Sequence, residues 1–443
     1  MTTWLIGLLL ILLITIFIGT PISFGLGFTA IAGIMIFIDP NQLNQPASIM
    51  YDLGTSVNQL IVPLFILMAE ILAQGKIASD IFTVISKWTG KLRGGLAISA
   101  TLAATVFAAL CGSSPATAAT IGRISISEMT KRGYKPDFAA GVVAAGGTLG
   151  IMIPPSIAMV VFGIITENSI AKLFIAGLLP GLMISGILIL YILIVGRFSP
   201  QTVGHTANAK KVAATSELIP STLETPTTFL QDMGVIIPPF GLIMIVLGSI
   251  YTGTATPIEA AGVGAVGALI LAIILRRLNM EVVKNIFSST ARTSAMVIFL
   301  IFGGMTLSYV VSYLGLAQSM ADLIIGLSVN KWVVLTGVYI LWFILGMLVD
   351  PLSMIILTVP FMYPTLLKLG FDPIWLGVVS TLAVEIGLIT PPVGLNLFVI
   401  KGISDIPMNK IIRGSIPFVG VLILCLIILT FFPIIATYLP SKM

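Results

Sequence analysis

Charged residues are scarce in this sequence, and their scarcity decides the class of protein. Only 9% of the 443 residues are Asp, Glu, Lys or Arg, whereas 57% are hydrophobic. Soluble domains contain about 25% charged residues, so the composition excludes an ordinary soluble fold and predicts a chain that crosses a membrane many times. The formal net charge of +5 does not indicate a nucleic-acid partner, because we assign the basic residues to loops that flank the membrane.

Residues that build catalytic and metal centres are also scarce. The two cysteines, Cys111 and Cys425, stand in apolar sequence, which argues against a disulfide framework or a metal site. The one histidine, His205, lies in a polar stretch, so no proton-transferring histidine is expected inside the membrane. No His cluster, Cys/His pair or serine–base set favours an enzyme, and no Gly-rich run continues into the Gly-Lys-Ser/Thr of a nucleotide-binding loop. If the chain moves a solute across the membrane, an ion gradient rather than a nucleotide is therefore the expected source of energy.

Two apolar stretches of membrane-spanning length, residues 138–166 and 373–401, are each interrupted by a Pro-Pro pair. Gly146–Ser156 in the first reads Gly-Gly-Thr-Leu-Gly-Ile-Met-Ile-Pro-Pro-Ser, and Glu385–Val393 in the second reads Glu-Ile-Gly-Leu-Ile-Thr-Pro-Pro-Val. Proline removes a backbone donor, and hydrocarbon tolerates such a break only where protein buries it or where it lines a water-filled cavity. Paired breaks in the two halves of a chain point to the binding site of a transporter.

The two breaks belong to a longer internal repeat with a constant displacement of 237 residues. The second half of the chain is therefore a sequence-related copy of the first. Without a gap, the displacement aligns Gly133, Pro136, Gly150, Pro154, Pro155, Gly177 and Pro180 with Gly370, Pro373, Gly387, Pro391, Pro392, Gly414 and Pro417.

Each half is predicted to contain spans, an amphipathic surface helix, a re-entrant hairpin, a broken helix and a final span. Apolar residues at helical spacing between charges indicate the surface helices, and paired half-length apolar segments with a polar tip indicate the hairpins. We also expect a polar loop up to Asn58 and a basic connector over 276–292. The N-terminal half covers 1–196 (surface helix 76–93, hairpin 95–130, broken helix 138–166), a polar linker covers 197–234, and the C-terminal half covers 235–443 (surface helix 316–329, hairpin 332–367, broken helix 373–401).

The distribution of basic residues predicts how the chain crosses the membrane. With the N-terminus outside, only Lys172, Lys331, Lys368 and Lys442 of the 22 lysines and arginines fall on the outer side. Lys and Arg are retained on the cytoplasmic side, so this layout is favoured. The first hairpin then opens inward and the second outward. We therefore predict an all-α polytopic membrane protein, built as an inverted-repeat transporter with two re-entrant hairpins and two broken helices.

Oxygen-bearing side chains recur at the hairpin tips and at the helix breaks. The displacement pairs Ser113 with Asp350, and Thr148 with Glu385. Hydroxyls, carboxylates and unwound carbonyls can replace the water shell of a sodium ion. The alternative is that the hydroxyls cap broken helix ends and the acids pair with neighbours, but the recurrence at four places favours cation binding. Glu70 lies in a span without a counterpart, and for it a structural pairing and a functional role carry equal weight.

Several motifs resemble those of a known family over nearly the whole chain. They are Gly112–Thr117, Lys131–Tyr134, Phe138–Gly141, Ala144–Ser156, Thr256–Ala261 and Gly346–Asp350. The sequence resembles the large membrane subunit of tripartite ATP-independent periplasmic (TRAP) transporters. The resemblance implies an elevator-type sodium symporter in a bacterial inner membrane. The layout favoured by the basic residues places both termini in the periplasm.

The resemblance also implies partners, ligands and site residues. The partners are a small four-helix membrane subunit and a periplasmic substrate-binding protein that delivers an organic acid; sodium ions couple transport, and no other cofactor is expected. The substrate carboxylate is expected at Ser114 and Ser156. Sodium is expected where Ser113, Ser114 and Thr117 meet Gly147, Thr148 and Gly150, and where Asp350 and Ser353 meet Glu385, Gly387 and Thr390.

Two questions stay open at the level of sequence. The chain is interpreted as one subunit of a binding-protein-dependent importer, and the alternative is a stand-alone carrier of organic anions driven by sodium or protons. The acid itself is also open: C4-dicarboxylates, sialic acids and other small carboxylates all fit, because in this family the binding protein does most of the selecting.

The inverted repeat predicts that Lys131 and Lys368, which occupy equivalent positions, face opposite sides of the membrane. Single cysteines introduced at these positions should react with a membrane-impermeant maleimide from the cytoplasm at 131 and from the periplasm at 368. Labelling of both cysteines from the same side would contradict the inverted arrangement of the two halves.

Overall fold

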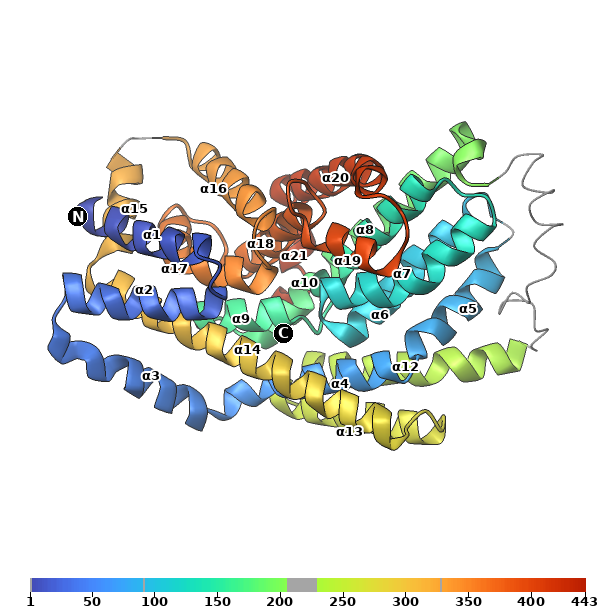
Figure 1. Cartoon of the computed structure of the whole chain (residues 1–443), viewed down its shortest axis with the longest axis horizontal. Helices are drawn as coiled ribbons and strands as arrows, with labels where there is room; N and C mark the ends of the chain where they lie inside the picture. Colours follow the sequence, from blue (N-terminus) through green and yellow to red (C-terminus); the bar gives the residue numbers. More distant parts are fainter. Residues whose placement is uncertain (1, 91, 205–228, 327–328) are drawn as a thin grey trace.

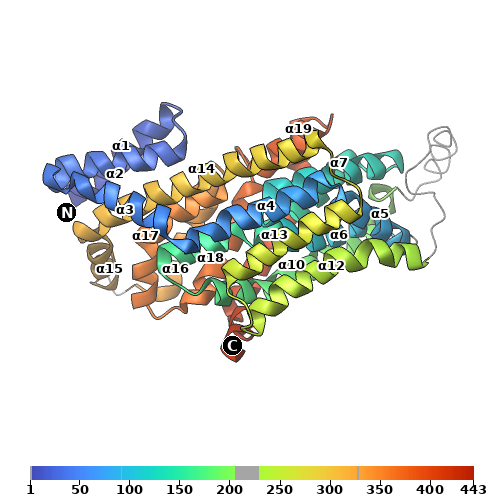
Figure 2. The same ribbon diagram turned by 90° about the horizontal axis from the view of Figure 1, so that it is seen from below.

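The computed structural model describes residues 2–90, 92–204, 229–326 and 329–443, and these residues form an elongated bundle of helices (Figures 1 and 2). No strand occurs in the described ranges, where Tyr134 and Val203 form an isolated β-bridge. Seven helices of the described chain are long and apolar enough to cross a membrane, or eight if one bent pair counts as a single span. The prediction of an all-α polytopic protein is confirmed.

The first half contains the expected succession of helices. Its hairpin consists of α6 and α7, and its broken helix of α8 and α9, which meet at a bend of 41°. The helices are α1 (Thr2–Phe17), α2 (Ile22–Phe37), α3 (Asn44–Thr55), α4 (Ile61–Gln74), α5 (Ile77–Thr89), α6 (Gly95–Cys111), α7 (Ser114–Lys131), α8 (Pro136–Met152), α9 (Ile157–Thr166) and α10 (Ile170–Phe198).

The second half repeats the hairpin and the broken helix at the same displacement. For example, the ends of α7 correspond by the 237-residue displacement to the ends of α17. The helices are α12 (Phe229–Tyr251), α13 (Pro257–Ile274), α14 (Met280–Tyr313), α15 (Leu316–Gly326), α16 (Lys331–Gly346), α17 (Pro351–Lys368), α18 (Pro373–Leu388), α19 (Leu395–Ile403), α20 (Met408–Phe431) and α21 (Ile434–Thr437).

Two segments that were expected to be irregular are helical. The polar loop up to Asn58 contains α3 between the short helices η1 (Pro40–Leu43) and η2 (Val57–Leu60). The basic connector 276–292 is helical from Met280 onward and forms the first part of α14. Asn279 caps α14 by accepting a hydrogen bond from the backbone N of Val282 at 2.8 Å. The polar and basic residues of these segments indicate exposure to solvent. They do not exclude a helix, because Lys, Arg and Glu are good helix formers.

The predicted linker 197–234 is narrower than its polar composition indicated. Helix α10 continues to Phe198, and α12 already begins at Phe229, with Asp232 in its first turn. An acidic residue is favourable in the first turn of a helix. The polar composition therefore placed the end of the linker a few residues after the start of α12. Residues 205–228 of the linker, and residues 327–328 of the predicted surface helix 316–329, lie outside the described part of the chain.

The helices pack in two groups. In one group the helices contact in succession, α2 with α14, α14 with α4, α4 with α13 and α13 with α12, and both views show α4, α12, α13 and α14 side by side (Figures 1 and 2). The other group joins the hairpins and broken helices of both halves, with α8 packed against α6, α7 and α20. Gly141 of α8 lies against the backbone of Gly414 of α20, where a Cβ on either residue would overlap the other helix. Small residues allow this close approach of helices inside a membrane.

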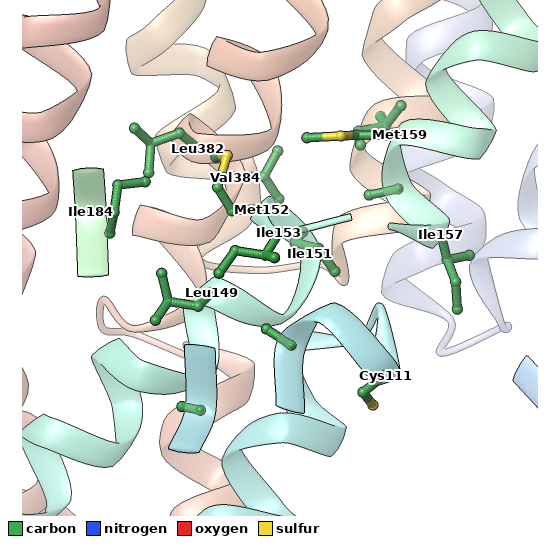
Figure 3. Close-up of a cluster of buried hydrophobic side chains, with 14 of the residues drawn as sticks. Cys111, Leu149, Ile151, Met152, Ile153, Ile157, Met159, Ile184, Leu382 and Val384 are labelled. Atoms are coloured by element: carbon green, nitrogen blue, oxygen red, sulfur yellow. The ribbon is translucent and has the colours of Figure 1, made fainter. Parts of the chain in front are cut away.

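The first helix break is enclosed by apolar side chains. Leu149, Met152 and Ile153 lie beside Ile184 of α10 and Leu382 of α18 (Figure 3), and all of them are buried. The interrupted backbone is therefore surrounded by protein, which is the condition under which a membrane tolerates non-helical chain.

Candidate functional site

The tip of the first hairpin docks on the first helix break. Gly112 has φ +65°, and a Cβ there would lie 2.6 Å from the carbonyl oxygen of Pro155. The backbone N of Ile157, the first residue of α9, donates to the carbonyl oxygen of Gly112 at 3.4 Å. A Cβ on Gly150 would lie 2.5 Å from the carbonyl oxygen of Ser113. Backbone thus packs directly on backbone, and glycine is required at the tip.

The other candidates in the first half surround this contact. Thr117 donates from its hydroxyl to the carbonyl oxygen of Ser113 at 2.9 Å, and its Oγ1 lies close to Gly150. Gly147 faces Ala118 of α7 and the side-chain amide of Asn396. The buried hydroxyl of Thr148 donates to Ala145 of its own helix at 2.6 Å. The structure therefore brings Ser113, Thr117, Gly147 and Gly150 together, while Thr148 bonds within α8.

The tip of the second hairpin docks on the second helix break in the same way. A Cβ on Gly387 would lie 2.6 Å from Cα of Gly346. The backbone N of Gly394, which precedes α19, donates to the carbonyl oxygen of Met347 at 3.1 Å. Thr390 donates from its hydroxyl to Ile386 at 2.6 Å, within its own helix turn. Each half therefore closes its own break with its own hairpin tip.

Asp350 lies at the N-terminus of α17. Its Oδ1 accepts hydrogen bonds from the backbone N atoms of Leu352 and Ser353, each at 3.1 Å, and its Oδ2 accepts one from the hydroxyl of Ser353. A carboxylate is favourable at a helix N-terminus because exposed N–H groups and the helix dipole stabilise its negative charge. Asp350 and Ser353 are thus adjacent, as their spacing in the sequence requires.

A buried polar cluster crosses from one half to the other. The hydroxyl of Ser114 donates to Oε2 of Glu385 at 2.9 Å, and Nδ2 of Asn396 donates to Oγ of Ser114 at 2.8 Å. All three residues are fully buried, with no exposed surface. We call Ser114, Glu385 and Asn396 the junction, because it joins the first hairpin to the second broken helix.

The junction contains two oxygens without a hydrogen-bond partner among the described residues, Oε1 of Glu385 and Oδ1 of Asn396. A buried acceptor left unpaired costs about 1–3 kcal/mol, and more when it is charged. Two such atoms in one cluster are an arrangement that a cation would relieve, because a sodium ion binds carboxylate and amide oxygens.

The sequence had grouped Glu385 with Asp350 and Ser353, and the structure instead turns its carboxylate toward Ser114. Helix geometry explains the difference. Glu385 and Gly387 are two residues apart, or about 200° around an α-helix, so they cannot face the same neighbour. Gly387 packs on the second hairpin, which leaves Glu385 on the side of the first.

Asn396 was missed by sequence reasoning. The repeat offered no signal, because its counterpart in the first half is Met159. The available signal was an amide in the otherwise apolar start of α19, Leu395–Val399, just after the second break. Buried amides need partners, so such an isolated Asn is itself a candidate for a polar site.

A cavity of about 330 Å³ lies between the two hairpin tips. One side of its wall consists of Gly112–Ala116, Asp350–Leu352 and the starts of α9 and α19, and the other side includes Glu70 of α4 and Thr293 of α14. Four helices, α7, α9, α17 and α19, thus begin at this cavity. Helix N-termini carry positive partial charge, which favours an anion. Asp350 already places one carboxylate against the N-terminus of α17, and Glu70 places a second acidic group in the opposite wall.

The two substrate candidates lie differently with respect to the cavity. Ser114 lines it, whereas Ser156 is not among the residues that line it. Oγ of Ser156 caps α9 by accepting a hydrogen bond from the backbone N of Met159 at 3.3 Å, and the residue is buried. Glu70 lines the cavity and accepts a long hydrogen bond of 3.5 Å from Gln74.

Comparison with known proteins identifies the family of the chain. Residues 9–435 match the family described as "Tripartite ATP-independent periplasmic transporter, DctM component". The chain belongs to this DctM family. It is a transporter permease and not an enzyme, and its many apolar helices make it a multi-pass protein of a bacterial inner membrane.

Relatives of this DctM-family chain span nearly its whole length. The C4-dicarboxylate TRAP transporter large permease protein DctM of Pseudomonas aeruginosa is 36% identical over 417 residues, which cover 94% of this chain and 93% of that protein. The ectoine/5-hydroxyectoine TRAP transporter large permease protein UehC of Ruegeria pomeroyi is 34% identical and covers 85% of each chain. The solved structure of the YdaH transporter of Alcanivorax borkumensis shares the fold, with a TM-score of 0.60 at 15% identity over 91% of this chain and 89% of that one.

Ser114→Ala should lower the stability of this DctM-family chain. The substitution removes the donor to Glu385 and the acceptor for Asn396, and unpaired buried groups cost about 1–3 kcal/mol. The measurement is the apparent Tm of the purified protein in a sodium-free potassium buffer. Ser113→Ala is the matched control, since no hydrogen bond of the Ser113 hydroxyl is seen in the described chain. Equal Tm values for the two variants would show that the junction does not hold the hairpin.

Proposed function

We propose that the chain is the substrate-translocating subunit of a sodium-coupled, binding-protein-dependent importer of small organic acids. The observation that carries the proposal is the cavity between the two hairpin tips, where four helices begin. Ser114 in its wall connects it to Glu385 and Asn396, whose oxygens include two without a hydrogen-bond partner among the described residues. An anion is stabilised at the N-termini, and cations are stabilised by the oxygens. One site thus provides for both ligands of a symporter.

Sodium binding is proposed at the two places where a hairpin tip meets a helix break. In the first half, Ser113, Thr117 and Gly150 supply hydroxyls and carbonyls in one contact. In the second half, Asp350 and Ser353 supply a carboxylate and a hydroxyl. Glu385 adds a buried carboxylate with a free oxygen between the two halves, which supports a cation on the side of the first hairpin.

The substrate carboxylate is proposed to bind at the N-termini of α7 and α9. Ser114 starts α7 and lines the cavity, and its hydroxyl is already held by the junction. Ser156 caps α9 through its oxygen, so its hydroxyl hydrogen is left to donate to an anion. A bound cation at the junction would change the hydrogen bonds of Ser114, and this gives a physical route for coupling between sodium and substrate.

Movement of the substrate is proposed to follow an elevator mechanism. The hairpin tips, the helix breaks and the junction all lie in one packed group of helices, while Glu70 and Thr293 on the opposite wall of the cavity belong to the other group. Displacement of the first group against the second would carry a ligand past α4 and α14 without breaking the hairpin contacts.

The partners are proposed to be a periplasmic substrate-binding protein and a small four-helix membrane subunit. Support comes from the family, whose name describes each chain as a component of a tripartite transporter. Its relatives are named for C4-dicarboxylate and for ectoine, so the substrate class stays at small organic acids.

The direct test of this function is uptake into proteoliposomes. The chain with its small subunit and binding protein should import a radiolabelled acid when sodium is outside, and replacing sodium with potassium should abolish uptake. The chain alone should transport little. Robust uptake by the chain alone would favour a stand-alone carrier. Equal uptake in sodium and in potassium would contradict sodium coupling.

Two substitutions should separate the sodium ligands from the substrate ligands. Asp350→Asn keeps an N-capping side chain on α17 but removes the negative charge, so it should raise the sodium concentration for half-maximal uptake. Ser156→Ala should mainly raise the substrate concentration for half-maximal uptake, by about 10- to 100-fold, since a charge-assisted hydrogen bond contributes about 1.5–3 kcal/mol. Both are measured over a grid of sodium and substrate concentrations.

Ser156→Thr serves as the control for the second substitution, because threonine retains a hydroxyl and can still cap α9. It should resemble the native protein. If Asp350→Asn leaves the sodium dependence unchanged, Asp350 is a helix cap only and the second sodium site must use backbone carbonyls and hydroxyls.

A further inference from the structure

A second hollow lies on the surface of helices α16, α18 and α20, away from the transport cavity. It has a volume of about 550 Å³ and shares no lining residue with the cavity between the hairpin tips. Its wall is almost entirely apolar and includes Leu335, Ile340 and Phe343 of α16 and Ile427 of α20. The polar atoms of Tyr339 and Thr430 satisfy each other through a 3.1 Å hydrogen bond. We call this hollow the α16 groove.

The α16 groove opens toward the surroundings of the protein rather than into its core. Ile340 and Ile427 in its wall are about half exposed, at 54% and 47%. In a chain that crosses the membrane, the medium that meets exposed apolar walls is lipid. The groove therefore needs an apolar occupant from the bilayer or from a neighbouring membrane protein.

The length of the groove decides between these two occupants. Along α16 its lining runs from Trp332 to Phe343, which is eleven steps of about 1.5 Å, or roughly 16 Å. The hydrocarbon core of a bilayer is about 30 Å thick, so the groove has the depth of a single leaflet. A spanning helix of a partner would need a surface about twice as long, whereas the acyl chain of a lipid extends over one leaflet.

A positive charge marks the mouth of the groove. Nζ of Lys331 lies 5.5 Å from the ring centroid of Trp332 and 5.4 Å from that of Phe371. Trp and Lys at the end of a spanning helix are typical of the membrane–water interface. Among the ion pairs of the described residues, none involves Lys331, so two aromatic faces rather than a carboxylate hold its ammonium group. It is thus available to an anion at the level of lipid headgroups.

We propose that the α16 groove binds one phospholipid, with an acyl chain along α16 and its phosphate against Lys331. The acyl chain then packs on Ala383 and Ile386 of α18, which stand two residues before and one residue after Glu385 of the junction. Lipid in the groove thereby supports the helix that carries the buried carboxylate. The groove shares no lining residue with the transport cavity, so the lipid and the substrate occupy different places.

The test uses phosphatidylglycerol with a photoactivatable diazirine in its acyl chain. The transporter, with its partner subunits, is reconstituted in vesicles of phosphatidylethanolamine that contain this probe, irradiated, and analysed by peptide mass spectrometry. Crosslinks should concentrate on the α16 residues Thr336, Ile340 and Phe343. Filling the groove with Ile340→Trp should reduce crosslinking to α16 by roughly tenfold, since a close-packed site has no room for both the indole ring and an acyl chain.

Val333→Trp is the matched control for the filling variant. Val333 is 61% exposed on the same helix but does not line the groove, so its variant should label like the native protein. Equal labelling of the two variants would overturn the proposal. Labelling of the small subunit in place of α16 would also overturn it, since a protein would then cover the groove. Sodium-driven uptake by both variants shows that each is folded.

Lys331→Gln tests the headgroup. With the phosphatidylglycerol probe, this variant should crosslink several-fold less than the native protein, because a charge-assisted hydrogen bond is lost. With a second probe, whose phosphate is methylated and neutral, the two proteins should crosslink equally. If the native protein and Lys331→Gln label equally with both probes, Lys331 does not bind the phosphate and that part of the proposal fails.

Discussion

Hydrocarbon provides no hydrogen bonds, and this constraint decides how the whole molecule is arranged. Two spans of this chain are broken at Pro-Pro pairs, so their freed backbone groups must be satisfied by protein. Each break meets the tip of a hairpin from its own half, through Gly112 and Ile157 in the first and Met347 and Gly394 in the second. The hairpins are therefore required by the breaks. The breaks, in turn, expose helix N-termini to one cavity, where an anion can bind.

The junction adds a bond between the halves. Packing of α7 on α19 and of α9 on α17 already joins the two halves. The junction adds hydrogen bonds to this packing, because Ser114 from the first half binds Glu385 and Asn396 of the second. Such a shared polar cluster is the physical basis on which we propose coupling, because energy is exchanged only through groups that both ligands influence.

The sequence predicted the parts that follow from periodicity and from special residues. The 237-residue repeat matched α7 with α17 as equivalent helices. The Pro-Pro pairs located both breaks, because proline and glycine act locally on the backbone. It could not predict that Glu385 turns away from Asp350, since that depends on which face of α18 packs on the second hairpin. Asn396 was missed because the repeat replaces it with Met159. The helical start of α14 was missed because polarity was taken to mean irregular structure.

The account stands on a cation that binds at the junction. The most direct measurement is the apparent Tm of the purified protein as sodium is titrated against a constant total salt concentration, with potassium as the replacing ion. A ligand that binds only the folded state stabilises it by RT ln(1 + [L]/Kd), so Tm continues to rise with ligand concentration. The native protein should gain stability with sodium, and Glu385→Gln should gain much less at the same concentrations. An equal sodium-dependent gain in both proteins would contradict the account, because the cation would then bind without the buried carboxylate.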